Sequence, residues 1–245
     1  MNELKSHPQI LLKEHIAQVK MAAEGIYQWH SEQLISKEVK KLSEMLAVLH
    51  DVGKSSAAFQ EYIVNPSAYK GESLGKAHSP LSLLFILLIS QKNEWTELDT
   101  LILAACAYGH HSALPYLPPE NFTDEISDHT LDNYATGTIA KILKKQILSI
   151  DLSLVKKATN IQFSQPYLSS KCINESEKYL QKIMPKFYSM TNDSIDESID
   201  FRLKTQLIFS ILLEADKAFL SVPDPKFHLE RKHRKWKSEW IKQKI

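Results

Sequence analysis

The sequence predicts an all-α protein, and three observations carry that prediction. Apolar residues recur at helical spacing through most of the 245 residues. Only 6 Gly and 10 Pro occur, which is few for a β-sandwich with many turns. No long segment alternates apolar and polar residues as a half-buried strand does. Because 43% of the residues are hydrophobic and 24% are charged, the chain has the composition of a folded protein, and we expect residues 1–245 to form a single helical domain.

The helices of the first half follow from where the apolar spacing begins and ends. The spacing predicts helices over residues 10–27, 39–49, 59–62, 78–90 and 98–108. Asn65 and Pro66 end the third of these helices, since proline does not continue a helix, and residues 66–75 are expected to form a loop. Pro80 lies in the first turn of the fourth helix, where a missing N–H costs least. Gly109 is expected to end the fifth helix.

The second half is predicted in the same way. Residues 112–133 are rich in Pro, Asp and Asn and are expected to be irregular. Helices are predicted over residues 139–148, 174–183 and 201–220, and a last, basic helix over residues 227–241. Pro223 and Pro225 separate the last two of these helices. The polar segment 191–198 is expected to be mobile.

Composition and patterning exclude several classes of protein. Cys106 and Cys172 are too few for a disulfide framework or a cysteine-rich zinc module. A net charge of +1 excludes a uniformly basic nucleic-acid binder. The longest apolar run, residues 81–89, is far shorter than the roughly 20 residues of a membrane helix. The first residues lack the pattern of a signal peptide, so we expect a cytoplasmic protein without a membrane partner.

Histidines and aspartates at helix ends or on apolar helix faces form the main functional signal. Imidazole nitrogens and carboxylate oxygens suit divalent first-row metal ions. The candidates are His15, His50, Asp51, His78, His110, His111 and Asp216. For any single histidine, the alternative is an ordinary hydrogen-bonded side chain. For Asp216, which has apolar neighbours, the alternative is an ion pair with Lys204 or Lys217, since a buried carboxylate needs a partner.

The order of these residues favours a site for two metal ions. Adjacent side chains on a helix point about 100° apart, so His50 and Asp51 can face one ion only if the helix ends between them. Gly53 and Gly109 supply such ends. The two oxygens of Asp51 could bridge two ions. Two-metal sites, with ions ~3.5–4 Å apart, typically catalyse displacement at phosphorus.

The motifs around these residues resemble one family. HDVGK at residues 50–54 with FQ at 59–60 resembles the HD phosphohydrolase superfamily. Together with KAHSPLS at 76–82, GHHS at 109–112 and LLEADKA at 212–218, the pattern is similar to the HD nuclease of type I CRISPR systems. That nuclease is part of the CRISPR-associated helicase–nuclease. Because this chain stops at Ile245, it resembles the form in which the nuclease is a separate subunit.

The resemblance implies an HD-domain helical bundle with a metal site between core helices, and a role for each matching residue. It places one metal ion on His15, His50, Asp51 and Asp216, and the second on Asp51, His78, His110 and His111. His30 competes with His15 for its place. Asp51 and Lys54 would be catalytic, with Lys54 beside the scissile phosphate; the alternative for Lys54 is an ordinary surface lysine. Ser79 and Ser112 would help to orient the substrate, although helix capping explains either serine equally well.

The resemblance also implies an activity. Members of the family hydrolyse phosphodiester bonds of single-stranded DNA in CRISPR interference, using metal-activated water. We therefore expect two divalent cations among Mn, Ni, Co, Fe and Mg. The expected partners are single-stranded DNA, a separate CRISPR helicase subunit and an RNA-guided surveillance complex. The segment GESLGKA at residues 71–77 lacks the spacing and the Ser or Thr of a P-loop, so a motor activity has to come from another chain.

Two other functions stay open at this point. HD proteins also include phosphohydrolases of small nucleotides, and a helical protein could serve as a non-catalytic adaptor. The basic segment 226–245 contains eight Lys or Arg and two Glu, a net charge of +6. It is expected either to pack Trp236 and Trp240 on the core, or to contact DNA or another subunit.

Overall fold

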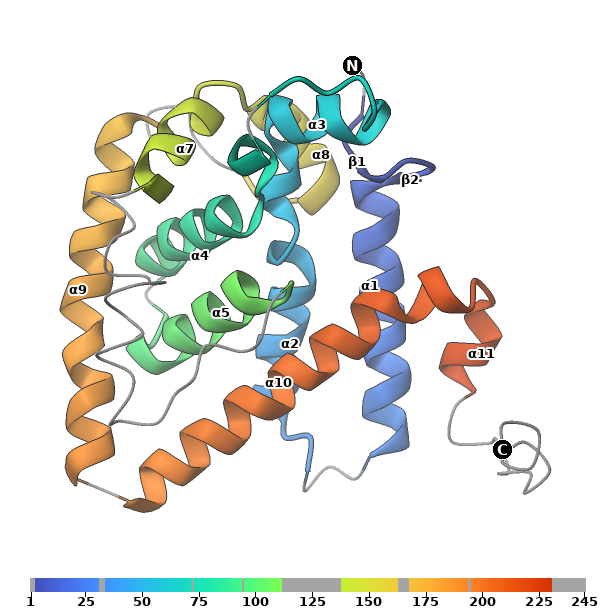
Figure 1. The fold of residues 1–245 in the computed structure, drawn as a ribbon. Helices are drawn as coiled ribbons and strands as arrows, with labels where there is room; N and C mark the ends of the chain where they lie inside the picture. Colours follow the sequence, from blue (N-terminus) through green and yellow to red (C-terminus); the bar gives the residue numbers. More distant parts are fainter. Residues whose placement is uncertain are drawn as a thin grey trace, which may run out of the picture.

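A helical bundle surrounds one buried helix, α4 (Ser79–Asn93), in the computed structural model (Figure 1). The structure describes residues 3–30, 34–71, 73–93, 95–111, 138–162, 168–193 and 195–230. Every residue of α4 from Pro80 to Ser90 is buried, as expected for a helix that is apolar on all sides. The expected all-α class is thus confirmed, and the apolar run 81–89 is a core helix.

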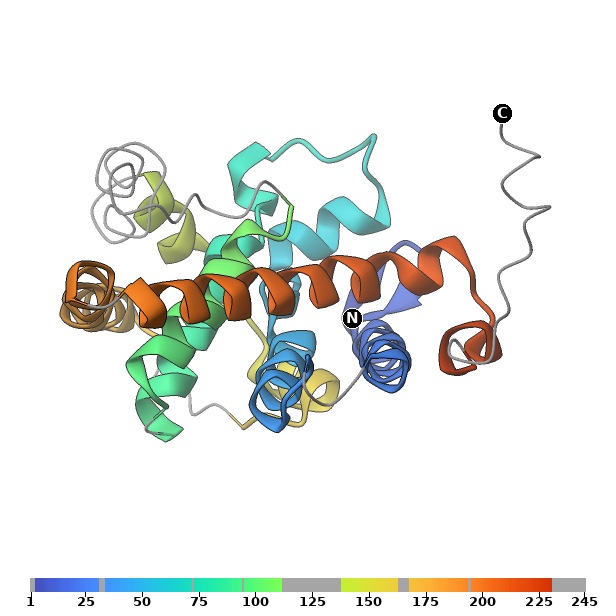
Figure 2. The same cartoon turned by 90° about the horizontal axis from the view of Figure 1, so that it is seen from below.

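The other long helices are α1 (Leu12–Trp29), α2 (Lys37–Leu49), α5 (Glu97–Gly109), α9 (Ser170–Asp193) and α10 (Ile195–Ser221). Helices α2, α5 and α9 contact α4, whereas α1 and α10 pack mainly on each other and on α2. Side chains fix two of their starts: Ser36 accepts a hydrogen bond from the Val39 N–H at the start of α2, and Thr96 does the same for Asp99 at α5. Figure 2 shows α10 crossing α5, α2 and α1 on one face of the bundle. This crossing brings Asp216 over the end of α2.

The chain turns sharply after α2, and this turn shapes the site. A 3₁₀ turn, η1 (Val52–Ser55), leads into α3 (Ala57–Val64), where the Ser56 hydroxyl accepts from the Phe59 N–H. Gly53 lies against the start of α4, and a Cβ built on it would be 2.0 Å from the carbonyl oxygen of His78. The absence of a side chain at Gly53 therefore brings the end of α2 and the start of α4 together. A second 3₁₀ turn, η2 (Ser73–Lys76), precedes α4.

Several expectations about the elements were wrong. An antiparallel hairpin of β1 (Lys5–His7) and β2 (Ile10–Leu11) precedes α1, so the first helix begins at Leu12. Strands of three and two residues are too short to show an alternating pattern. Helix α8 (Leu152–Thr159) was not predicted. Helices α9 and α10 extend through most of segment 191–198, which was expected to be mobile; the polar residues of 195–200 are mainly the exposed side of α10.

The remaining predictions have mixed outcomes. Helix α7 (Thr138–Ile147) matches its expected position closely. Of the expected last helix, the structure describes only α11 (Pro225–Leu229), which Asp224 caps through the Lys226 N–H. The rest of the basic segment, with both of its tryptophans, and the expected irregular segment 112–133 lie outside the described residues. Within the described residues, no helix is both long enough and apolar enough to cross a membrane.

Candidate metal centre

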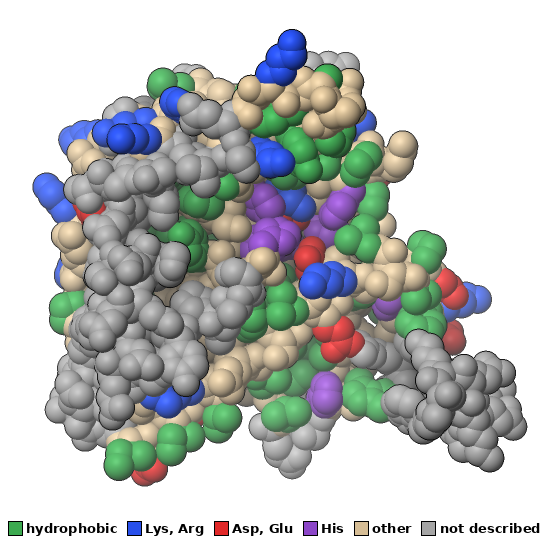
Figure 3. Space-filling view, viewed as in Figure 1, with side chains coloured by type: hydrophobic (Ala, Val, Ile, Leu, Met, Phe, Trp, Pro, Cys, Tyr) green, Lys and Arg blue, Asp and Glu red, His purple; other side chains and the backbone are tan. Residues whose placement is uncertain are grey.

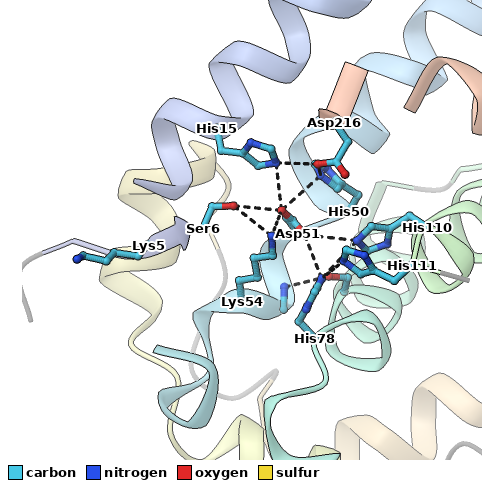
Figure 4. Close-up of polar contacts among 12 residues, drawn as sticks. Lys5, Ser6, His15, His50, Asp51, Lys54, His78, His110, His111 and Asp216 are labelled. Atoms are coloured by element: carbon cyan, nitrogen blue, oxygen red, sulfur yellow. Dashed lines mark hydrogen bonds and ion pairs between the residues drawn. The ribbon is translucent and has the colours of Figure 1, made fainter. Parts of the chain in front are cut away.

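Asp51 lies at the centre of a cluster of histidines and carboxylates that five helices bring together (Figure 4). It follows α2 directly, after His50 at the end of that helix. The other members come from α1, from the start of α4, from the end of α5 and from α10: His15, His78, His110, His111 and Asp216. The structure thus gathers all seven sequence-predicted ligands, although they span two hundred positions of the chain.

The first group of potential ligands contains His15, His50, Asp51 and Asp216. The Nε2 atom of His15 lies 2.9 Å from Oδ1 of Asp216 and 3.2 Å from Oδ2 of Asp51. The Nε2 atom of His50 lies 3.4 Å from Oδ1 of Asp216 and 3.5 Å from Oδ2 of Asp51. Two imidazole nitrogens and two carboxylate oxygens therefore converge on one point.

The second group contains Asp51, His78, His110 and His111. Here the Oδ1 atom of Asp51 faces Nε2 of His78 at 3.1 Å and Nε2 of His110 at 3.4 Å. The Nε2 atoms of His111 and His78 are 2.9 Å apart, and those of His78 and His110 are 3.3 Å apart. Each oxygen of Asp51 thus faces a different group, which is the arrangement of a bridging carboxylate.

The hydrogen bonds of the histidines fit a site for cations. The Nδ1 atoms of His50 and His110 lie 3.1 and 2.7 Å from the carbonyl oxygens of Ala47 and Ala107. A carbonyl only accepts, so each Nδ1 carries the proton and each Nε2 turns its lone pair to the cluster. Among the described residues, His50 Nε2 and Asp51 Oδ1 are buried without a hydrogen-bond partner. Divalent cations would satisfy these atoms.

The carboxylates of the cluster are held in the ionised form. Burial alone would raise the pKa of Asp51, but the charges of His50 and Lys54 hold this pKa well below its usual range. Burial likewise opposes ionisation of Asp216, yet the hydrogen bond from His15 keeps its pKa low. Although burial acts in the opposite direction, the two carboxylates raise the pKa of His15. Both Asp51 and Asp216 are therefore available as anionic ligands.

The histidines of the second group favour the neutral form. Burial lowers the pKa of His78, although the nearby Asp51 carboxylate opposes this shift. Burial and the nearby His110 and His78 lower the pKa of His111 to about 3. Neutral imidazole is the form that binds a metal ion, so at neutral pH these two side chains are ready to bind without losing a proton.

Lys54 is buried beside Asp51 and is not an ordinary surface lysine. Its Nζ lies 2.6 Å from Oδ2 of Asp51 and donates a hydrogen bond to Ser6 Oγ at 3.2 Å. This location puts an ammonium group beside the cluster, where the anionic substrate of a metal site would bind.

Three alternatives from the sequence are wrong. Lys204 does not pair with Asp216, because it contacts Glu38 and Asp200, and Lys217 is exposed. His30 is exposed at the end of α1 and belongs to neither ligand group. Asp216 is instead paired within the cluster itself, and His15 occupies the place for which both histidines were candidates.

Sequence reasoning missed the residues that the hairpin brings to the site. Ser6 Oγ donates to Oδ2 of Asp51 at 3.3 Å, and the ring of His7 packs edge-on against His15 with centroids 5.0 Å apart. Gln60 holds the hairpin in place: its Oε1 accepts from the Lys5 N–H, and its Nε2 donates to the carbonyl oxygens of Lys5 and Lys54. The only signal for these contacts was the FQ motif at 59–60.

The two serines that were expected near the substrate have different outcomes. Ser79 is the half-buried first residue of α4, and the structure leaves its role a prediction. Ser112 lies outside the described residues. A third serine, Ser82, was missed: its Oγ accepts a hydrogen bond from the Gly53 N–H at 3.0 Å, and it thereby joins η1 to α4.

Among the described residues, the cluster reaches the solvent on one side, at His111. His111 is exposed, whereas the side chains of His78 and Asp216 are each 10% exposed and those of His15 and His110 are 1% exposed. Figure 3 shows histidine side chains at the floor of a hollow in the centre of this face, with Lys or Arg side chains nearby. A substrate can therefore approach across His111 and His78.

An all-helical bundle with a His-Asp pair at the end of one core helix, completed by histidines and a second aspartate from the others, defines an HD-type domain. The chain belongs to the Cas3 HD domain family, whose model, described as "Cas3, HD domain", matches residues 4–163. This finding confirms the resemblance to the HD nuclease of type I CRISPR systems. Asp216 lies beyond the matched residues, so its position in the site comes from the fold.

A comparison with solved structures agrees on the fold. The chain is similar to a CRISPR-associated Cas3 HD domain protein from Methanocaldococcus jannaschii, with a TM-score of 0.50 and 16% sequence identity. The similarity covers 88% of this chain and 100% of the other. No curated protein matches the chain.

Adding Mn²⁺, Co²⁺ or Ni²⁺ to chelator-treated protein is expected to raise its melting temperature. A ligand at 100 times its Kd stabilises the folded state by about 2.7 kcal/mol, which corresponds to roughly 5–10 °C for a chain of this size. Differential scanning fluorimetry checks this expectation. His30→Ala, outside both ligand groups, should respond as the unchanged protein does. A melting temperature that none of the three ions moves would contradict the assignment of a metal centre.

Proposed function

We propose that this protein is a divalent-metal-dependent deoxyribonuclease that hydrolyses phosphodiester bonds of single-stranded DNA in CRISPR interference. One observation carries the proposal: in a chain of the Cas3 HD family, the two oxygens of Asp51 face two separate four-residue ligand groups. Two cations among Mn, Ni, Co, Fe and Mg fit these groups. When bound, such ions activate water for attack on phosphorus and polarise the phosphoryl oxygen.

The residues of the chain have complementary tasks in this proposal. Asp51 and Lys54 serve as the catalytic pair: Asp51 fixes the spacing of the two groups, and the Lys54 ammonium, 2.6 Å from Asp51, offsets the charge of the scissile phosphate. The backbone hydrogen bonds of His50 and His110 hold their rings in one orientation. No serine or cysteine nucleophile is needed, and Cys106 is a buried residue of α5.

Among the described residues, the exposed side of the cluster at His111 favours a polymer over a small nucleotide. A strand can reach His111 there without entering a pocket formed by the described residues. We propose further that the protein acts in the cytoplasm as a single domain, together with a separate helicase subunit and an RNA-guided surveillance complex. These partners would present the opened strand.

A cleavage assay with defined substrates tests the proposal. Chelator-treated protein is supplied with Mn²⁺, Ni²⁺, Co²⁺ or Mg²⁺ in turn and is given labelled single-stranded DNA, duplex DNA, RNA and a panel of nucleotides. We expect at least one ion to support cleavage of the single strand in preference to the duplex. Hydrolysis of nucleotides without cleavage of DNA would favour a nucleotide phosphohydrolase instead. Metal-free protein that cleaves nothing with any ion would favour a non-catalytic adaptor.

A further inference from the structure

We propose that a row of aromatic rings beside the metal centre stacks the bases of a DNA single strand and so places its backbone at the metals. This row, called the aromatic track here, consists of Phe59, Tyr62 and Tyr69, with Lys76 next to it. The inference rests on the proposed nuclease function, because it names the surface that would hold the strand.

The track starts at a potential metal ligand and leads away from it. The ring of Phe59 lies 5.3 Å from the ring of His78, Tyr62 follows at 6.3 Å from Phe59, and Tyr69 lies 5.8 Å from Tyr62, as measured between centroids. Phe59 is buried, whereas Tyr62 and Tyr69 are half-buried. The inner ring thus anchors the row in the core, and the outer rings are accessible to a ligand. Proteins that bind single strands commonly stack bases on accessible aromatic rings.

Lys76 supplies the charge that a strand requires. Its Nζ lies 3.9 Å from the centre of the Tyr62 ring, in a cation–π contact. Stacking of a base on a tyrosine is generally stronger than a partly exposed contact of this kind. A base that stacks on Tyr62 therefore displaces the ammonium group, which then moves onto the adjacent phosphate. One residue thus covers the ring in the free protein and binds the backbone in the complex.

The backbone around the track is fixed from two sides. Gln146 of α7 donates from Nε2 to the carbonyl oxygens of Gly75 and Ala77, at 2.9 and 2.7 Å, and so holds the residues on both sides of Lys76. Tyr69 packs closely on Gly71, where a Cβ would lie 2.3 Å from the tyrosine hydroxyl. A surface that is ordered before binding loses less conformational entropy when the ligand binds.

Two clefts flank α3, and their charges differ. The cleft next to the track has a volume of about 450 Å³, and Tyr69, Lys70 and Lys145 lie in its lining, which contains no carboxylate among the described residues. The other cleft, of about 610 Å³, is lined in part by Glu61 and Asp151, and its described lining contains no lysine or arginine. A polyanion is attracted to the first cleft and repelled by the second. The strand is therefore expected to leave the metal centre along the track.

Tyr62→Leu tests the stacking step, with Tyr62→Phe as its matched control. Leucine keeps most of the volume but removes the aromatic face, whereas phenylalanine keeps the ring. Binding of a labelled single strand to chelator-treated protein is measured by fluorescence anisotropy, with no need for cleavage. We expect Kd to rise about 10-fold for Tyr62→Leu, the usual loss for one stacked base, and to stay unchanged for Tyr62→Phe. With an abasic oligonucleotide the difference between Tyr62→Leu and the unchanged protein should disappear.

Lys76→Ala tests the phosphate contact, with Lys37→Ala, an exposed lysine of α2, as its control. Removal of one phosphate contact is expected to lower the slope of log Kd against log salt by about 0.7 for a single strand. Hydrolysis of bis(p-nitrophenyl) phosphate, a diester without bases, should be unchanged in Tyr62→Leu and Lys76→Ala when metal is supplied.

The outcomes separate this inference from the proposed function. The aromatic track is refuted if Tyr62→Leu binds the strand as the unchanged protein does, or loses the same affinity for the abasic strand. It is also refuted if both variants lose activity on the small diester, since the residues would then support the metal centre. Binding that depends on Tyr62 without DNA cleavage under any metal would leave the track in place and overturn the nuclease function.

Discussion

Replacement of Asp51 by asparagine is expected to reduce DNA cleavage to background and to remove metal from both ligand groups together. The reason is the shared carboxylate: Oδ2 faces His15 at 3.2 Å, and Oδ1 faces His78 at 3.1 Å. An amide offers one weak oxygen ligand and one NH₂ group that repels a cation. Metal content, measured by mass spectrometry after dialysis against the activating ion, should fall from two ions per chain to none.

Asp216→Asn is the matched comparison, because Asp216 belongs to the first ligand group alone. It is expected to remove one ion and leave the other. Asparagine is preferable to alanine at residue 51, since its amide oxygen can still accept a hydrogen bond from the buried Lys54 ammonium, whereas alanine offers no acceptor there. If Asp51→Asn and Asp216→Asn lost the same number of ions, the bridging role of Asp51 would be wrong.

The sequence identified the residues that the structure brings together because each of them lies at a helix end or on an apolar helix face. His50 and Asp51 follow an apolar helix and precede Gly53, and His110 and His111 follow Gly109. Where a helix ends, adjacent side chains can point toward the same ion, which is not possible within a continuing helix. Asp216 was identifiable because a carboxylate among apolar neighbours needs a partner. These signals are local in the sequence, so they can be recognised before the packing of the helices is known.

The residues that were missed depend on contacts between distant segments. Ser6 and His7 reach the site through a hairpin of two short strands, to which Gln60 bonds from 55 positions further along the chain. The spacing of apolar residues in the sequence does not indicate a contact between segments so far apart. The same holds for Ser82, one serine among the apolar residues of α4, whose hydroxyl accepts from Gly53. The polar start of α10 was also misjudged, since a helix with one exposed side resembles a mobile segment when its packing is unknown.

Gly53→Ala is expected to destabilise the protein and to separate the two halves of the metal centre. An alanine Cβ would lie 2.0 Å from the His78 carbonyl oxygen and 2.9 Å from the Ser82 nitrogen. Both are backbone atoms, so the start of α4 has to move away from η1, and His78 moves with it. Overpacking of this kind costs about 1–3 kcal/mol, which lowers the melting temperature by roughly 2–12 °C in a chain of this size. We also expect the metal of the second ligand group to be lost first.

Gly25→Ala is the control, because it introduces a similar backbone clash far from the metal centre. Its Cβ would lie 2.2 Å from the carbonyl oxygen of His228, so the substitution pushes α11 away from α1. Helix α11 has five residues and can move without displacing any metal ligand, so cleavage per folded molecule should be retained. Thermal melts, metal content and cleavage rates of both variants decide the matter. A Gly53→Ala protein that keeps its melting temperature and both metals would show that the close approach of η1 to α4 does not position His78, and that the second ligand group is held in place by α5 alone.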